Sequence, residues 1–339
     1  MNFSAYMQEW LYGEEGYYTK KRTIGKEGDF YTAASTSMFF GGSIAKKLIQ
    51  TIESGFLSPA CHVVEIGAHK GFLLADMIQF LYTLRPSLLE SLTFVIVEPF
   101  VENQQMQKKY FQESFGDAIC LVHVKALEEL SAKEAFVVAN EIFDAFACEV
   151  IKEDHYLCIE NHKAFFMPMD AMMVEALKPF GISKGEVCFG YLPFARSLAR
   201  SFKRYEFVTF DYGDKDARED FSLRIYANHH TYPFFTLTDL VENALRAPFG
   251  LEEMFQKADI TYDVNFTHLI DAFVQTGAVL ELYTTQMKAL VEFGLIDLLE
   301  ILYENSSTKA YTQEMNKIKI LIDPAFMGER FKMLCLRLV

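Results

Sequence analysis

The sequence predicts an α/β protein with a mostly parallel sheet covered by helices on both faces. Apolar runs bounded by turn residues alternate with segments of helical periodicity over the first two thirds of the chain. The clearest unit, residues 61–84, passes from an apolar run through a glycine-bounded turn into a helix. The chain has 339 residues, of which 51% are hydrophobic, so it can bury a large core in one domain with insertions or in two smaller domains.

The first half of this pattern consists of four strands, two of them followed by clear helices. The predicted strands are His62–Ile66, Thr93–Val97, Ile119–Val124 and Ala135–Ala139, and the helices are Gly71–Leu84 and Gln104–Phe115. The first helix carries its leucines, Met77 and Ile78 on one side, which is the face expected to lie on the sheet.

The alternation breaks after the fourth strand. From Glu149 to Met169 short apolar runs are separated by turn residues at 153–154 and 161–162, which predicts an antiparallel excursion. The parallel pattern returns at Glu206–Phe210, and Tyr226–Phe255, which contains prolines and a glycine, is expected to form a helical cover over one edge. Later strands are expected at Ile260–Val264, Val279–Tyr283 and Phe331–Leu338, the last closing the sheet.

The charge balance limits the classes of partner. The 32 basic and 46 acidic residues give a net charge of −14, and the basic clusters at 20–22 and 46–47 are short. A protein that binds nucleic acid by neutralising phosphates needs a much stronger basic patch. The sequence therefore predicts no nucleic-acid partner and favours a cationic segment of another protein.

Cysteine usage and the apolar pattern bear on compartment. The six cysteines are scattered without a C-x-x-C pair, which is typical of reduced thiols. The first ten residues do not have the pattern of a secretory leader, and no apolar run reaches the length of ~18 residues that a membrane span needs. We therefore expect a cytoplasmic protein without membrane insertion. The pair His229-His230 has no acidic or cysteine partner at ligand spacing, so no metal site is predicted.

A glycine-bounded loop follows the first strand. Gly67 and Gly71 allow the backbone to turn tightly and to approach a ligand, and Glu98 ends the next strand, where a carboxylate can accept hydrogen bonds from two ribose hydroxyls. The spacing differs from the G-x-G-x-x-G of a pyrophosphate cofactor, and the acidic loop suits the cationic S-adenosylmethionine. The predicted cofactor-binding residues are Glu65, Gly67, Ala68, His69, Gly71, Glu98 and Asn140. The alternative is that Gly67 and Gly71 are ordinary turn glycines without a ligand.

Ordered motifs along nearly the whole chain carry a family resemblance. They include Leu11-Tyr12, Gly28-Asp29-Phe30-Tyr31-Thr32-Ala33, Glu65-Ile66-Gly67, Asn140-Glu141-Ile142-Phe143-Asp144, Asp211-Tyr212-Gly213, Asp259-Ile260-Thr261 and Met327-Gly328-Glu329-Arg330. With these blocks the chain resembles the MidA family of S-adenosylmethionine-dependent methyltransferases, whose mitochondrial members are complex I assembly factors that methylate a protein arginine. The resemblance implies a class I, Rossmann-like methyltransferase fold with S-adenosylmethionine as the cofactor. It also implies a protein substrate, for which a subunit of a respiratory complex is a candidate. It does not indicate an oligomeric state.

Five positions depart from the family pattern, and two of them, Ala34 and Ala147, stand where the family has prolines. His69 replaces the central glycine of the cofactor loop, Ser35 stands where the family has a glutamate, and Asn265 stands where it has an aspartate. The sequence therefore leaves two functions open. One is methylation of a protein side chain, with arginine favoured, and the alternative is a catalytically impaired protein of the same fold that acts in binding or assembly.

The acceptor site is predicted after the fourth strand, where this fold faces the methyl group that is transferred. Glu141 and Asp144 are the catalytic candidates there, because two carboxylates can hold a guanidinium through its fork of donors and accept its proton. A surface acid and a helix cap are the alternatives for these two residues. Asp29, in an N-terminal segment expected to act as a lid, is a third catalytic candidate, with an Asx turn as its alternative.

Together these features predict four consecutive segments. Residues 1–50 form an N-terminal lid or helical segment, and residues 51–225 form the Rossmann-like cofactor-binding core with an antiparallel insertion near 149–170. Residues 226–310 form a mainly helical accessory or substrate region with late core strands, and residues 311–339 form a C-terminal helix and the closing strand.

Overall fold

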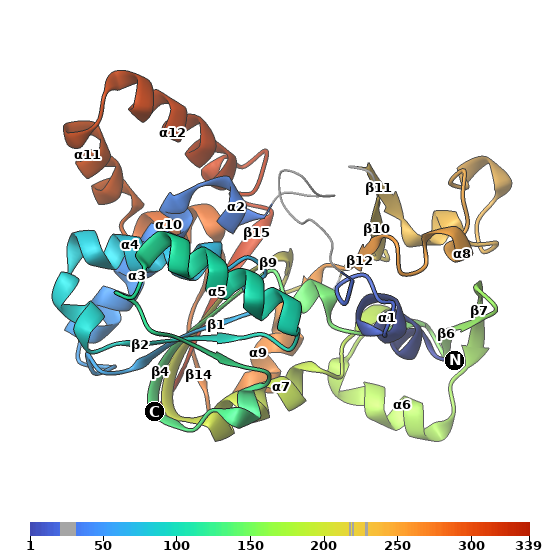
Figure 1. Cartoon of the computed structure of the whole chain (residues 1–339). Helices are drawn as coiled ribbons and strands as arrows, with labels where there is room; N and C mark the ends of the chain where they lie inside the picture. Colours follow the sequence, from blue (N-terminus) through green and yellow to red (C-terminus); the bar gives the residue numbers. More distant parts are fainter. Residues whose placement is uncertain (21–31, 217, 219, 228–229) are drawn as a thin grey trace. The chain divides into compact units, whose positions relative to one another are not determined.

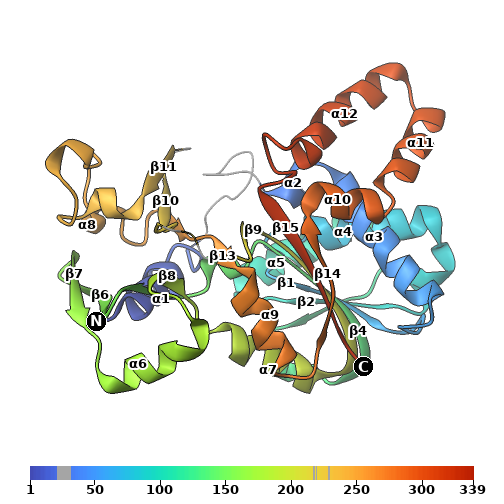
Figure 2. The ribbon, with the colours of Figure 1, turned by 180° about the vertical axis from the view of Figure 1, so that it is seen from behind.

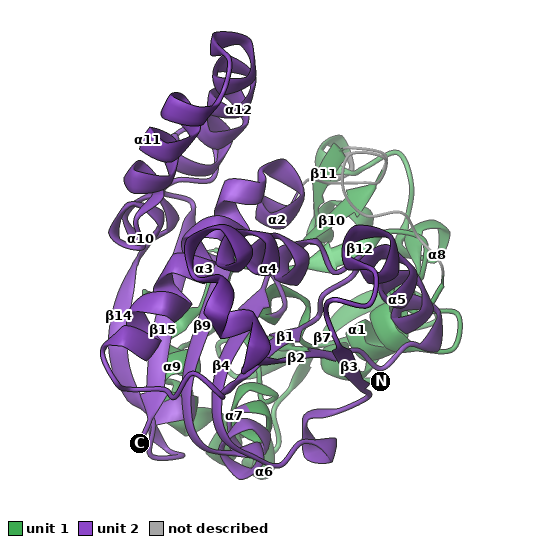
Figure 3. Cartoon of the chain, turned by 60° about the vertical axis from the view of Figure 1, so that its left-hand side comes forward, with its two compact units in different colours: residues 1–30, 143–194, 213–272 green, residues 31–142, 195–212, 273–339 purple. Residues whose placement is uncertain are grey.

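The computed structural model describes residues 1–20, 32–216, 218, 220–227 and 230–339. The chain divides into two units, shown in Figure 3. Unit 1 consists of Met1–Phe30, Phe143–Phe194 and Gly213–Ala272, and unit 2 consists of Tyr31–Ile142, Ala195–Tyr212 and Phe273–Val339. Each unit thus draws on three separate stretches, a grouping that differs from the four consecutive segments expected from the sequence.

Unit 2 contains most of a mixed sheet with the strand order β14-β15-β9-β4-β1-β2-β3. These strands are β1 (His62–Ile66), β2 (Thr93–Val97), β3 (Leu121–Val124), β4 (Ala132–Asn140), β9 (Phe202–Asp214), β14 (Val279–Thr285) and β15 (Phe331–Leu338). The pairs from β9 to β3 are parallel, whereas β15 pairs antiparallel with β9 and with β14. Strand order reverses between β1 and β4, the place where this class of sheet binds its ligand.

The central strands are buried because their apolar runs are nearly continuous. In β1 and β2 the interior positions are all buried, as expected for parallel strands covered on both faces. The predicted boundaries of these two strands are confirmed residue for residue, and those of the third and fourth differ by a few residues at their ends. The predicted α/β architecture is confirmed.

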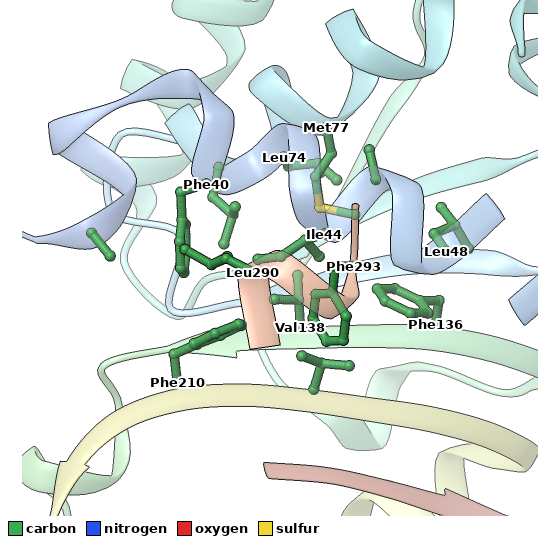
Figure 4. Close-up of a cluster of buried hydrophobic side chains, with 14 of the residues drawn as sticks. Phe40, Ile44, Leu48, Leu74, Met77, Phe136, Val138, Phe210, Leu290 and Phe293 are labelled. Carbon is green, nitrogen blue, oxygen red and sulfur yellow. The ribbon is translucent and has the colours of Figure 1, made fainter. Parts of the chain in front are cut away.

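Helices cover one face of this sheet in Figure 1: α3 (Met38–Glu53), α4 (Phe72–Leu84) and α5 (Val101–Phe115). Figure 4 shows the cluster that α3 and α4 make over the sheet, in which Phe40 and Leu74 lie above Phe136 and Phe210. Their burial excludes water from this face and contributes the main hydrophobic stabilisation of unit 2.

The opposite face of the sheet packs against the part of α7 (Tyr191–Ser201) that belongs to unit 2, seen in Figure 2, and against Phe273 near the end of α9 (Phe266–Val274). Ala195 and Leu198 of α7 are fully buried, and Phe207 of β9 stacks on Phe273 with ring centroids 5.0 Å apart. Parallel strands have apolar side chains on both faces of the sheet, and helices on both faces bury them.

The last strand does not close the sheet, so this prediction is wrong. β15 lies between β9 and β14, and β14 occupies the edge. Residues 333–336 of β15 are all buried, whereas β14 has no buried residue, and an apolar run of this kind requires a neighbour on each side. The connection between these strands contains α10 (Gln286–Glu292), α11 (Leu295–Asn305) and α12 (Thr308–Ile322).

In unit 1, the predicted antiparallel excursion is confirmed. The strands β5 (Glu149–Lys152), β6 (His155–Glu160), β7 (Lys163–Pro168) and β8 (Lys184–Val187) form an antiparallel sheet of order β7-β6-β5-β8. The β6–β7 turn places Asn161 and His162 at φ 48° and 58°, the left-handed values of a two-residue hairpin loop.

The predicted helical cover at 226–255 is wrong. Unit 1 has a second sheet there, together with short helices. The strands β10 (Arg224–Ala227), β11 (His230–Pro233) and β12 (Asp259–Thr261) pair in the order β11-β10-β12. The helices in this stretch are short: η5 (Phe234–Leu237), η6 (Asn243–Leu245) and α8 (Leu251–Met254). Pro233, Pro248 and Gly250 interrupt any longer helix.

Helix α1 (Phe3–Tyr12) packs on strands of unit 1, and Trp10 Nε1 donates to the Ala258 oxygen at 2.7 Å. Helix α2 (Ala33–Thr36) belongs to unit 2, so the first 50 residues contribute to both units. The remaining elements are η1 (Pro86–Glu90), η2 (Leu127–Glu129), η3 (Phe143–Ala145), α6 (Ala171–Leu177), η4 (Lys178–Phe180) and β13 (Val264–Asn265).

Candidate active site

The predicted cofactor residues follow three neighbouring strands of unit 2. The loop 67–71 follows β1, Glu98 follows β2, and Asn140 ends β4. Ile66 at the end of β1 pairs with Val97 of β2 and with Ala139 of β4. Since these strands are parallel and in register, the residues after them lie at one edge of the sheet.

Gly67 and Gly71 are required by the geometry of the loop. Gly67 has φ 73°, and a Cβ there would lie 2.8 Å from Ile142 Cγ2. Gly71, at φ 79°, is the N-cap of α4, and a Cβ there would lie 3.0 Å from the Phe111 ring. Any side chain at these positions meets both backbone strain and a close neighbour. Ala68 between them is buried.

His69 also has a left-handed backbone, at φ 46°. A non-glycine residue in this region costs on the order of 1–3 kcal/mol, and such strain is concentrated at functional sites. Its carbonyl oxygen accepts a hydrogen bond of 2.7 Å from Gln107 Nε2. The loop thus keeps the conformation that glycine adopts easily, and a hydrogen bond from α5 supports it.

Glu65 on β1 is 4% exposed and holds the loop from beneath. Its Oε2 accepts from the Leu74 backbone N–H at 3.0 Å, which ties β1 to the first turn of α4. Burial raises the pKa of Glu65 to about 8, the Leu74 hydrogen bond opposes this, and the nearby Asp76 adds to it. A protonated Glu65 supports a role in shaping the loop rather than in supplying charge.

Glu98 is similarly buried but has more hydrogen-bond donors. Its Oε1 accepts from the Phe100 backbone N–H at 3.0 Å, and its Oε2 accepts from Gln107 Nε2 at 3.3 Å. Burial raises the pKa of this carboxyl, while hydrogen bonds from Phe100, Asn103 and Gln107 lower it. A carboxylate offers about four acceptor sites, so the three protein donors leave Glu98 about one further site for a ligand.

Asn140 and Glu141 form a joined pair at the end of β4. Asn140 Nδ2 donates to Glu141 Oε1 at 2.7 Å, and the Ala33 backbone N–H at the start of α2 donates to the same oxygen at 3.1 Å. Glu141 has φ 54°, a second strained non-glycine position at this edge. Two donors and a fixed backbone therefore orient the Glu141 carboxylate.

The residues at this edge fit S-adenosylmethionine. Asn140 Oδ1 is buried and has no hydrogen-bond partner among the residues that the structure describes. A buried acceptor of this kind is costly unless a ligand supplies a donor, and the cofactor carries an ammonium group. Gly67 leaves the start of the loop without a side chain, and Glu98 follows the neighbouring strand at the same edge.

Asp144 lies in unit 1, in the short helix η3, and is 6% exposed. Its charge and that of Asp259 raise the pKa of Tyr12, although burial is the larger cause. The Tyr18 hydroxyl donates to Asp259 Oδ1 at 3.0 Å. Asp144 is therefore part of a buried acidic and tyrosine-containing cluster, which sequence reasoning missed although Asp259 stands in one of the motifs. Asp29 lies outside the described residues.

Two of the residues that depart from the family pattern, Ser35 and Asn265, make hydrogen bonds at the starts of helices. The Thr32 hydroxyl accepts from the Ser35 backbone N–H at 3.2 Å, and Ser35 Oγ accepts from the Thr32 backbone N–H at 3.1 Å, which completes a capping box. Asn265 Oδ1 accepts from the His268 backbone N–H at 3.1 Å in the first turn of α9. Asparagine and aspartate serve equally as caps, so Asn265 can fill this role as an aspartate would.

The comparison with protein families identifies the chain. The model of a family described as "Putative S-adenosyl-L-methionine-dependent methyltransferase" matches residues 43–284, more than half of the chain. The chain belongs to this methyltransferase family. The matched range includes the loop 67–71 and both Glu98 and Glu141.

Curated relatives agree with this assignment, and a solved structure shares the fold. The methyltransferase is 22% identical over 372 residues to the mitochondrial protein arginine methyltransferase NDUFAF7 of Bos taurus, covering 98% of this chain and 79% of that protein. It is 29% identical over 159 residues to the Drosophila melanogaster homolog, where the match spans 42% of this chain and 36% of that relative. A Burkholderia thailandensis protein solved with S-adenosyl-homocysteine shares the fold, with a TM-score of 0.79, 24% identity, and coverage of 99% of this chain and 87% of that one.

These relatives overturn one prediction. The expected cytoplasmic location is wrong, because the relatives from four animals are all named as mitochondrial. The expectation rested on reduced cysteines and on a missing secretory pattern, and reduced thiols fit any compartment that keeps them reduced.

No helix among the described residues of the methyltransferase has the length and hydropathy to span a membrane. The described residues also contain no group of three or more histidine, cysteine or acidic side chains placed to hold a metal ion.

Proposed function

We propose that this methyltransferase transfers the methyl group of S-adenosylmethionine to a guanidinium nitrogen of an arginine in a partner protein. The observation that carries the proposal is the Glu141 carboxylate, oriented by two donors at the edge of the sheet where the cofactor residues lie. The relatives from Bos taurus and Danio rerio, each matched over 98% of this chain, are named as protein arginine methyltransferases.

The chemistry divides between cofactor and protein. When bound, S-adenosylmethionine supplies an electrophilic methyl group on its sulfonium. Glu141 accepts N–H hydrogen bonds from the guanidinium and holds one nitrogen in place, and Asp144 and Asp29 are the further carboxylates proposed for the acceptor. Transfer exchanges an N–H bond for an N–C bond and releases one proton, which Glu141 accepts at its carboxylate.

The proposed partner is a protein. More specifically, we propose a subunit of a respiratory complex, which the family resemblance implies. The net charge of −14 favours a basic segment of such a partner over nucleic acid. The alternative, a binding protein without turnover, is less favoured. The substitutions at Ser35 and Asn265 keep their local hydrogen bonds, and the loop at His69 keeps a left-handed backbone.

The test is a methylation assay with labelled S-adenosylmethionine and protein extract from cells that lack this chain. We expect labelled methylarginine in the protein hydrolysate, enriched in the respiratory-complex fraction. Glu141→Gln is expected to lower turnover by about 10²- to 10³-fold with binding of S-adenosylhomocysteine unchanged. The matched control is Glu102→Gln, an exposed glutamate on α5, which should retain full activity. Label on another residue type, or full turnover by Glu141→Gln, would overturn the proposal.

A further inference from the structure

Gln107 is an unusual residue on its helix. α5 is largely polar and exposed, and its buried residues are Gln107 and Phe111. The Gln107 side chain is fully buried. Burying an amide costs free energy unless its donors and acceptor are satisfied, so its hydrogen bonds indicate what it does.

These hydrogen bonds connect two separate parts of the cofactor edge. Nε2 donates to the His69 carbonyl oxygen at 2.7 Å and to Glu98 Oε2 at 3.3 Å. One amide group therefore links the loop after β1 to the carboxylate after β2. The Phe100 backbone N–H holds the other oxygen of Glu98 at 3.0 Å, so both carboxylate oxygens have a donor from the protein.

His123 on β3 sets the orientation of this amide. Its Nε2 lies 2.9 Å from Gln107 Oε1, and because an amide oxygen only accepts, the imidazole donates here. Its Nδ1 is buried with no hydrogen-bond partner among the described residues, as expected for the unprotonated nitrogen of a neutral ring. Burial, with a smaller effect of Lys108, lowers the pKa of His123 to about 4, so the ring stays neutral near pH 7.

We propose that Gln107 is a positioning residue for the nucleoside of the cofactor, acting through Glu98 on the ribose and through the His69 carbonyl on the loop. Without the amide, Glu98 has one fewer donor to define the plane of its carboxylate, and the strained loop loses its support from α5. The proposal rests on the cofactor site described above but not on the identity of the methyl acceptor.

The test is calorimetric titration with S-adenosylhomocysteine and with its 2′-deoxy analogue. Gln107→Leu is expected to weaken binding of S-adenosylhomocysteine on the order of tenfold and to weaken binding of the 2′-deoxy analogue much less, because the ribose contact is already reduced there. Gln105→Leu, an exposed glutamine on the same helix, is the matched control and should bind both ligands as the wild type does.

His123→Leu is the second variant, since it leaves Gln107 in place and frees its amide to turn. We expect the same selective loss, smaller in size, with an unchanged melting temperature. Equal losses for the two ligands, or no loss for either, would contradict a role through Glu98. Absence of S-adenosylhomocysteine binding by the wild type would instead remove the cofactor site itself, and a failed search for methylarginine leaves this test intact.

Discussion

Glu65 and Glu98 belong to adjacent parallel strands and are almost equally buried, at 4% and 3% exposure, yet their surroundings differ. Glu65 accepts one backbone hydrogen bond, from Leu74, and burial raises its pKa to about 8. Glu98 accepts from Phe100 and Gln107, and these bonds oppose the effect of burial on its pKa. Burial raises the pKa of both carboxyls; one hydrogen bond opposes this rise at Glu65, and hydrogen bonds from Phe100, Asn103 and Gln107 oppose it at Glu98.

Of the effects that test this comparison, the largest is expected for the pH dependence of the free energy of unfolding that Glu65 causes. Its pKa of about 8 in the folded protein lies above its ordinary value of 4.5. The contribution of Glu65 to stability is therefore fully present below about pH 4.5 and is lost as the pH rises through about 8. The free energy of unfolding is expected to fall by about 3–5 kcal/mol over this window and to fall much less in Glu65→Gln.

Denaturant unfolding at about pH 5 and about pH 9 measures this dependence. Asp76→Asn should also show a smaller pH dependence than the wild type, because burial and Glu314 raise the pKa of Asp76 to about 7 and because Asp76 adds to the raised pKa of Glu65. Identical pH dependence in Glu65→Gln and in the wild type would show that Glu65 is ionised in the folded protein.

Glu98→Gln has the next largest expected effect, on ligand affinity. The substitution replaces one acceptor oxygen of the carboxyl by an amide donor, so the ribose hydroxyls lose an acceptor and S-adenosylhomocysteine binding should weaken about 10- to 100-fold. Glu65→Gln is the matched comparison and should bind as the wild type does. Calorimetric titration of both variants decides the matter, and the reverse ranking would assign the ligand contact to Glu65.

His69→Gly has the smallest expected effect. Glycine relieves the left-handed backbone at φ 46°, which should stabilise the protein by about 1 kcal/mol, or about 1–3 °C in Tm. Affinity for S-adenosylhomocysteine should not change, because the hydrogen bond with Gln107 uses the His69 backbone. Thermal unfolding and titration measure the two quantities, and weaker binding would show that the imidazole itself contacts the cofactor.

Much of unit 2 was predictable because buried parallel strands are apolar runs whose ends are marked by turn residues. The boundaries of β1, β2 and β15 follow from that pattern alone. The stretch 226–255 was misread, because short strands interrupted by Pro233 and Pro248 carry no strong periodicity. The position of β15 inside the sheet was also not predicted, since the sequence does not show which strands lie on its two sides.

The site divides in the same way. Gly67, Glu98, Asn140 and Glu141 were identified from their positions after strands, and their roles stay proposals for the experiments above. Gln107 gave no signal, because a glutamine on a polar helix looks solvated until the fold buries it.

By itself the sequence determined the alternation of strands and helices, the turn of the cofactor loop and the family, because each is written in local pattern or ordered motifs. Only the tertiary structure decided which polar groups lose water and which donors reach them. Burial and hydrogen-bond donors together set the pKa shifts of Glu65 and Glu98, and packing buries Gln107. They depend on residues that are distant in the chain and become neighbours only when the sheet and helices pack.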